Sequence, residues 1–194
     1  MNNIKVVYFS AEIGIENHIK TFSGGLGMLA GGTVRAMADL EFPFCAVTLL
    51  YKHGFLKQKV IDNTQTEEDD SWDFMNILQN CHKEVKIRIN GENVYVKIWK
   101  YEHTGITGHK VPIYYLDTDF EKNPDWAKGI TNKLYQGNRL HQEMVLGMAG
   151  LKALRELGHN KIEKFHMNEG HSSFLTLELY KEFGEKIGWD EGLV

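Results

Sequence analysis

The first fifty residues carry two apolar runs separated by a helical pattern. Residues 4–9 (IKVVYF) and 44–51 (FCAVTLLY) are hydrophobic at nearly every position, which is typical of strands buried on both faces of a parallel sheet. Between Gly25 and Leu40 the apolar residues recur every three or four positions, and this spacing predicts a helix. The pattern therefore predicts a β-loop-α-β unit with parallel strands.

The middle of the chain has the pattern of antiparallel strands. Residues 85–89 (VKIRI) and 94–99 (VYVKIW) alternate between apolar and polar across Asn90-Gly91, which is a strong hairpin signal. Residues 111–116 (VPIYYL) predict another strand, whose proline lies near the start, where a missing N–H is tolerated.

An acidic segment precedes this hairpin. Residues 64–73 hold five carboxylates and no basic residue, and we interpret them as a solvated loop. Together with the hairpin, this segment forms a β-rich insertion at about 53–110.

Helical spacing returns in the last third of the chain. Apolar residues at three- and four-residue spacing predict a helix over 134–157, and Gly158 is suited to end it. Residues 164–167 predict a short strand, after which Ser172 or Ser173 is expected to cap a last helix. The predicted fold class is α/β, with a parallel sheet flanked by helices.

Composition narrows the class of protein. The 194 residues carry a net charge of −4, whereas a nucleic-acid-binding surface is expected to be basic. Two cysteines, Cys45 and Cys81, favour a reducing compartment without a disulfide framework. There is no signal-peptide pattern and no run of 18 apolar residues. We expect a cytoplasmic protein that does not span a membrane.

A glycine-rich stretch at 21–32 (TFSGGLGMLAGG) precedes and opens the first predicted helix. It contains the dinucleotide pattern G-x-G-x-x-A, but fifteen residues separate it from the preceding strand and no acidic residue ends the next one. A phosphate loop is excluded because Gly32 is followed by Thr33 rather than lysine. Two interpretations remain: the glycines bring a helix N-terminus close to an anion or a sugar, or they allow tight packing.

Six blocks of sequence, in order, resemble the α-glucan (glycogen, starch, maltodextrin) phosphorylase family, most closely its shorter bacterial and archaeal branch. The resemblance extends over nearly the whole chain and is weakest across 60–110. The blocks are YFSAEIGI (8–15), FSGGLGMLAGG (22–32), VTLLYKHGFLKQ (47–58), YLDTD (115–119), RLHQEMVLGMAGLKALRELG (139–158) and FHMNEGHSSFLTLE (165–178).

The resemblance implies a fold and a reaction. Such enzymes have two Rossmann-like domains facing a cleft, the GT-B arrangement, and residues 1–194 correspond to the N-terminal one. They transfer a glucosyl unit between an α-1,4-glucan and phosphate, giving α-glucose 1-phosphate with retention. Pyridoxal 5′-phosphate is bound to a lysine of the C-terminal domain, which has no counterpart here. We therefore expect a fragment that is inactive alone, from an enzyme that can form homodimers.

The resemblance also implies site residues. Gly24, Gly25 and Leu26 correspond to the family loop whose amides contact the phosphate and the glucosyl unit. His171, in the motif NEGH, matches a histidine that lines the glucosyl pocket and reaches the 6-hydroxyl. Glu12 matches a glutamate at the base of the catalytic pocket; partnership with a basic residue is the alternative.

Other polar residues in these blocks have more ordinary interpretations. Asn168 and Glu169 can orient the His171 turn or simply form loop hydrogen bonds. Arg139 and Glu143 are four residues apart, which favours an intrahelical ion pair. Because His166 and His171 are five apart and no third ligand is evident, we expect no metal site.

Two competing functions stay open. A glycogen or starch synthase domain has a related fold and a Lys-x-Gly-Gly-Leu-Gly element, but Lys20 lies two residues too early for that spacing. A module that only binds glucan or phosphate is the non-catalytic alternative. Gly32 departs from the family pattern, which usually has aspartate there.

Overall fold

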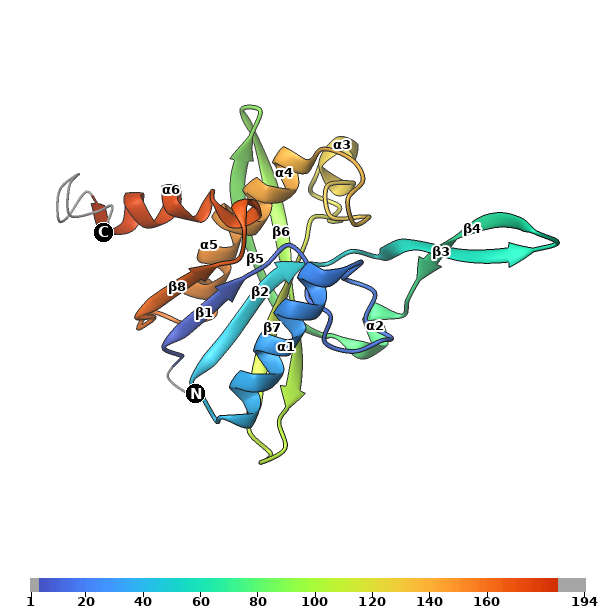
Figure 1. Ribbon diagram of the computed structural model, residues 1–194. Coiled ribbons are helices and arrows are strands. Elements are labelled where there is room, and N and C mark those ends of the chain that lie inside the picture. The colour runs from blue at the N-terminus through green and yellow to red at the C-terminus, as the bar shows by residue number, and fades with distance from the viewer. Residues whose placement is uncertain (1–3, 185–194) are drawn as a thin grey trace.

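A six-stranded sheet forms the centre of the computed structural model, which describes residues 4–184 (Figure 1). The strand order is β5-β6-β7-β2-β1-β8. Strands β7, β2, β1 and β8 pair in parallel, whereas β5, β6 and β7 pair antiparallel. The predicted α/β class is confirmed, with the sheet parallel in one half only. The strands of this sheet are β1 (Val6–Phe9), β2 (Phe44–Leu49), β5 (Gln79–Ile89), β6 (Glu92–Thr104), β7 (Lys110–Asp117) and β8 (Lys164–Met167).

Helices cover both faces of the sheet (Figure 1). Along β1, Val7 and Phe9 belong to one hydrophobic core and Tyr8 to the other, since successive strand residues point to opposite faces. Helix α1 packs on the Tyr8 face, and the α4 to α6 region packs on the other. The helices are α1 (Gly25–Asp39), α2 (Phe74–Ile77), α3 (Asp125–Lys128), α4 (Arg139–Met144), α5 (Gly150–Glu156) and α6 (Leu175–Leu179), with π turns at Val145–Ala149 and Tyr180–Gly184 and a 3-10 turn at Gly170–Ser172.

The hairpin predicted at Asn90-Gly91 is confirmed. Asn90 (φ 53°) and Gly91 (φ 81°) both have the left-handed backbone that a two-residue hairpin turn requires. Its strands, β5 and β6, are longer than the alternating pattern suggested, and they extend the main sheet. The β-rich segment 53–110 is therefore partly continuous with the central sheet.

The prediction of a loop at 64–73 is wrong. Thr64–Ser71 forms strand β4, which pairs antiparallel with β3 (His53–Ile61). This two-stranded hairpin projects from the body of the molecule (Figure 1). Two of the acidic residues have basic partners: Glu68 Oε2 lies 2.6 Å from Lys59 Nζ across the hairpin, and Asp70 Oδ2 lies 3.2 Å from Lys20 Nζ outside it. Such cross-strand pairs stabilise a strand that a charge count alone assigns to a loop.

The long helix predicted over 134–157 begins later and is interrupted. It starts at Arg139, where the Asn138 side chain accepts a hydrogen bond from the His141 amide at 3.3 Å. A π turn at Val145–Ala149 separates α4 from α5. Gly158 adopts a left-handed φ of 87° directly after the helix, which confirms the predicted end.

The prediction that Ser172 or Ser173 caps the last helix is wrong. Helix α6 begins at Leu175, and no side chain caps its N-terminus. The hydroxyl of Ser172 is buried and instead donates to the Asn168 carbonyl at 3.3 Å. A 3-10 turn takes up the residues in between.

Candidate functional site

The loops that follow β1 and β8 meet at the carboxyl ends of these parallel strands. The Asn168 amide nitrogen Nδ2 donates to Ser10 Oγ at 3.1 Å, and Ser10 Oγ donates to the Glu12 carbonyl at 2.7 Å. The backbone N–H of Asn168 also bonds to the Phe9 carbonyl at 2.9 Å. Ligands of open α/β sheets bind at this edge, and three segments with predicted site residues lie here.

Gly24 and Gly25, at the start of α1, are open to solvent. Gly24 precedes α1 with extended backbone (φ −156°, ψ −156°), and Gly25 is the first helical residue. A Cβ built on either would meet no atom within 4 Å. Neither has a positive φ. Within the described part of the chain, neither packing nor backbone conformation requires glycine at these positions, and the half-buried Leu26 follows them.

Two other glycines of the 21–32 stretch are packing positions. A Cβ on Gly27 would lie 2.4 Å from Phe22 Cβ and 2.9 Å from Glu12 Oε2. A Cβ on Gly31 would lie 2.0 Å from the Gly14 carbonyl oxygen. The packing interpretation therefore holds for Gly27 and Gly31, whereas the approach of an anion or a sugar to Gly24 and Gly25 stays a prediction.

Glu12 is buried and accepts two hydrogen bonds. Its Oε2 accepts from the Ser23 amide at 2.7 Å, and its Oε1 accepts from the Tyr135 hydroxyl. These donors are an amide and a phenol, not a basic side chain. Burial, followed by the hydrogen bond to Glu12, raises the pKa of Tyr135 to about 12. Tyr135 thus stays protonated at neutral pH and holds the carboxylate that anchors the glycine loop.

Tyr135 is held in an uncommon conformation by its loop. Its φ is 58°, a left-handed backbone value that residues other than glycine rarely adopt. The buried amide of Gln142 donates to the carbonyls of Ile130, Lys133 and Gln136 at 2.9, 3.2 and 3.0 Å. A single side chain of α4 therefore fixes the loop that presents the Tyr135 hydroxyl.

Arg139 contacts the second predicted site loop. Its Nε lies 3.1 Å from Glu143 Oε1, so the predicted intrahelical ion pair is confirmed. Its Nη2 also hydrogen-bonds to Nε2 of His171, and its guanidinium carbon lies 5.9 Å from the Tyr135 ring centre. The polar contacts thus run from Ser23 through Glu12 and Tyr135 to Arg139 and His171.

A small pocket lies where this network reaches the strand ends. The Nδ1 atom of His171 is buried and has no hydrogen-bond partner among the described residues. Burial raises the pKa of Tyr51, with further contributions from Tyr135 and Glu12, so this wall of the pocket is a neutral phenol. The pocket is lined by Ala11, Leu49, Tyr51, Tyr135, Arg139, Gln142, Glu143, Leu146 and His171.

His166 and the lysines within residues 4–184 were considered as ligands for a metal ion or a covalently bound cofactor. His166 packs edge-on against Tyr8, with ring centres 4.9 Å apart, and residues 4–184 contain no group of three side chains arranged for a metal ion. No lysine in that range is buried.

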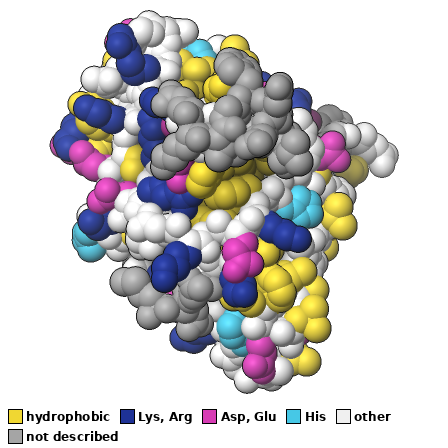
Figure 2. Space-filling model, turned by 90° about the vertical axis from the view of Figure 1, so that its left-hand side faces the viewer, with side chains coloured by type: hydrophobic (Ala, Val, Ile, Leu, Met, Phe, Trp, Pro, Cys, Tyr) yellow, Lys and Arg dark blue, Asp and Glu magenta, His cyan; other side chains and the backbone are white. Residues whose placement is uncertain are grey.

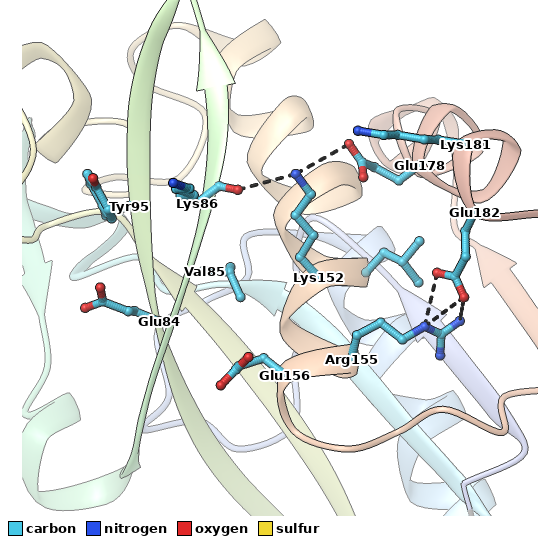
Figure 3. A pocket seen from close by; sticks show the side chains of 11 residues that line it. Glu84, Val85, Lys86, Tyr95, Lys152, Arg155, Glu156, Glu178, Lys181 and Glu182 are labelled. Carbon is cyan, nitrogen blue, oxygen red and sulfur yellow. Dashed lines mark hydrogen bonds and ion pairs between the residues drawn. The ribbon is translucent and has the colours of Figure 1, made fainter.

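A more open groove lies elsewhere, between β5 and the helices α5 and α6 (Figure 3). It encloses about 850 Å³, yet it contains none of the predicted site residues. Its charged side chains largely neutralise one another, as where Lys152 Nζ lies 3.8 Å from Glu178 and Arg155 Nη2 lies 2.9 Å from Glu182. On the face shown in Figure 2, acidic and basic side chains are likewise interspersed.

Sequence reasoning missed Tyr135 and underestimated Arg139. Tyr135 lies outside the recognised blocks, and its contact with Glu12 joins residues 123 positions apart. Because Glu143, four residues along the helix, already accounts for the charge of Arg139, the sequence gives no reason to expect the contact with His171. Gln142, a polar residue within an apolar helix pattern, is the one sequence signal that a buried side chain of this helix bonds to the preceding loop.

No helix within residues 4–184 has the length and apolar character needed to cross a membrane.

Comparison with known proteins gives consistent matches. Residues 10–119 match the family model of carbohydrate phosphorylase. The chain is 36% identical to an uncharacterised protein of Methanocaldococcus jannaschii, over 91% of the chain and 34% of that protein. It is 31% identical to glycogen phosphorylase of Aquifex aeolicus (97% and 28% covered) and 32% identical to maltodextrin phosphorylase of Thermococcus litoralis (97% and 23%). The chain thus spans about a quarter to a third of the length of these relatives.

Proposed function

The chain belongs to the carbohydrate phosphorylase family, and on this premise we propose that it forms one wall of the active site of an α-glucan phosphorylase. The reaction is transfer of a glucosyl unit from an α-1,4-glucan to phosphate, giving α-glucose 1-phosphate with retention. The names of the relatives from Aquifex and Thermococcus, a glycogen and a maltodextrin phosphorylase, support this substrate class.

The observation that carries the proposal is the open pair Gly24 and Gly25. Glycine costs conformational entropy when ordered, and the described fold gives no reason for that cost at these two positions. A ligand that approaches the backbone gives one, because the absence of Cβ exposes amide groups at the N-terminus of α1, where anions are favoured. Phosphate and the reacting glucosyl unit are such a ligand. Fixed amide dipoles would stabilise the charge that develops as the glycosidic bond breaks.

The remaining site residues have supporting roles in this proposal. Leu26 continues the amide-bearing loop, and His171 contributes a ring nitrogen to the sugar pocket. Glu12, through the Ser23 amide, keeps the glycine loop in place, and Asn168 joins the β8 loop to the β1 loop through Ser10.

The proposal extends to the protein that contains this chain. We propose a GT-B arrangement in which this α/β unit faces a second domain that carries the pyridoxal phosphate lysine. When bound, the cofactor supplies a phosphate group for proton transfer beside the substrate phosphate. The 194-residue chain alone is then expected to form no glucose 1-phosphate. A homodimer and a cytoplasmic location stay predictions of the family resemblance.

A matched pair of variants tests the role of the open glycines. In the phosphorylase that contains this chain, Gly25→Val should lower phosphorolytic turnover by about a hundredfold or more, the range found when an oxyanion donor is lost. Gly32→Val places the same side chain in the same helix, also in open space, and should leave turnover unchanged. Circular dichroism should show both variants folded. Unchanged turnover in Gly25→Val would contradict the proposal.

Two assays distinguish the alternatives. A synthase would extend glucan from a sugar nucleotide, whereas a phosphorylase releases glucose 1-phosphate only when phosphate is present. A binding module without catalysis would show maltooligosaccharide-induced NMR shifts around Gly24 to Leu26 or His171, but no release of glucose 1-phosphate by the longest form of the protein.

A further inference from the structure

The contact between Arg139 and His171 determines which ring nitrogen carries the proton. A guanidinium group has only N–H donors and no acceptor. Because Arg139 Nη2 hydrogen-bonds to His171 Nε2, that nitrogen must offer its lone pair. The imidazole in this arrangement is neutral, with its hydrogen on Nδ1.

The second ring nitrogen is then an unused donor. Nδ1 is buried and has no partner among the residues that the structure describes, and His171 is part of the lining of the small pocket. A buried N–H without an acceptor is unfavourable by about 1–3 kcal/mol. This N–H is therefore available to an acceptor atom that does not belong to the described residues.

Arg139 is itself held in place by two further groups. Its Nε lies 3.1 Å from Glu143 Oε1, and its guanidinium carbon lies over the Tyr135 ring, 5.9 Å from the ring centre. The Arg139 side chain is 61% exposed, so these contacts, rather than burial, orient its guanidinium group. A lysine would lack the second nitrogen needed to bond Glu143 and His171 at fixed angles.

We propose that Arg139 is a positioning residue that fixes His171 as the Nδ1–H tautomer, so that the ring donates to an oxygen of the bound substrate. The acceptor class, a sugar hydroxyl, rests on the proposed function, whereas the tautomer does not. In the opposite tautomer, the Nε2 hydrogen would face the Arg139 donors and the buried Nδ1 would carry a lone pair instead of a hydrogen. Arg139 disfavours that arrangement by placing two donors against each other.

Nitrogen-15 NMR of the histidine side chains tests the tautomer directly. At about pH 8, where an ordinary imidazole is neutral, wild-type His171 should show a protonated Nδ1 and an unprotonated Nε2. Arg139→Met, which keeps a long side chain but removes the donors, should spread the signal over both tautomers or shift it to Nε2–H. A wild-type His171 with its hydrogen on Nε2 would overturn the proposal, even if the variant did not fold.

Two controls separate hydrogen bonding from charge. Arg88→Met removes an exposed arginine whose Nη2 donates to the Gly91 carbonyl rather than to His171, and should leave the His171 spectrum unchanged. Glu143→Gln removes the charge of the ion-pair partner but leaves the Arg139 donor, so the Nδ1–H form should persist. If Arg88→Met altered the His171 tautomer as much as Arg139→Met did, the contact with Arg139 would not be the cause.

Activity measurements test the use of this tautomer. In the phosphorylase that contains this chain, Arg139→Met should lower kcat/KM for glucan by up to about a hundredfold, the cost of a misplaced catalytic-site group. Combined with His171→Ala, it should cause little further loss, because both changes remove one interaction. Fully additive losses would overturn the coupling. A wild-type protein without phosphorolysis would refute the proposed function but leave the NMR result standing.

Discussion

The adjacent glycines Gly31 and Gly32 allow the packing of α1 to be tested, because alanine adds a single methyl group at either position. Gly31 faces the loop after β1, and a Cβ there would lie 2.0 Å from the Gly14 carbonyl oxygen and 2.6 Å from its carbon. Gly32 is exposed, and a Cβ there would meet nothing within 4 Å. Gly31→Ala and Gly32→Ala are thus the same substitution at a buried and at an exposed position of one helix.

The expected changes in stability have opposite signs. Gly32→Ala gains about 1 kcal/mol of helix propensity, which corresponds to an increase in Tm of roughly 2–4 °C for a chain of this size. Gly31→Ala gains the same propensity, but the backbone at Gly14 must retreat from 2.0 Å to about the 3.4 Å of an ordinary contact. Overpacking of this kind costs up to about 3 kcal/mol, so a net loss of about 2 kcal/mol is expected.

Urea denaturation and thermal melts of the two variants measure this difference directly. The free energies of unfolding should differ by about 3 kcal/mol, with wild type between them. If Gly31→Ala were as stable as Gly32→Ala, α1 would not approach the loop after β1 as closely as described. The assignment of Gly31 as a packing position would then be refuted.

Two further predictions concern single side chains. Tyr135→Phe leaves Oε1 of the buried Glu12 without its donor and should lower the free energy of unfolding in urea by about 1–3 kcal/mol; a change below about 0.3 kcal/mol would contradict the clamp. The pKa of His159 is lowered, first by burial and then by Arg155, so the unfolded chain binds more protons below about pH 6.5 and stability should fall as the pH drops through this window. His159→Gln should flatten that part of the stability profile, whereas an unchanged slope would exclude His159 as a contributor.

The elements that are predicted best from the sequence are those whose conformation depends on their own residues rather than on distant partners. Residues 4–9 and 44–51 are strands because both faces of the parallel sheet are covered, so every position is apolar. The Asn90-Gly91 turn has a local conformational cause. The prediction of a loop at 64–73 is wrong because β4 pairs with β3, and a run of carboxylates does not reveal the lysines on a neighbouring strand.

The sequence predicts several residues of the candidate site, but it does not predict the hydrogen bonds and ring contacts that join them. Glu12, Asn168 and His171 lie at the expected edge of the sheet, but nothing in the sequence indicated that Tyr135 or Arg139 joins them. A left-handed tyrosine arises from the whole loop that surrounds it, not from its neighbours in sequence. Likewise, sequence left the glycines with two interpretations, and only the surroundings of each Cβ divided them.

The π turn at Val145–Ala149 sets the rotational phase between the two halves of one helix. Before it, Arg139 and Gln142 are directed at the pocket and its loop; after it, Leu151 and Leu154 are directed into the core. Each residue advances an α-helix by about 100°, and a π turn contains one residue more than an α turn. Loss of one residue within this turn would leave both halves helical but rotate them against each other. The helix is therefore more sensitive to a change of length than to most changes of composition.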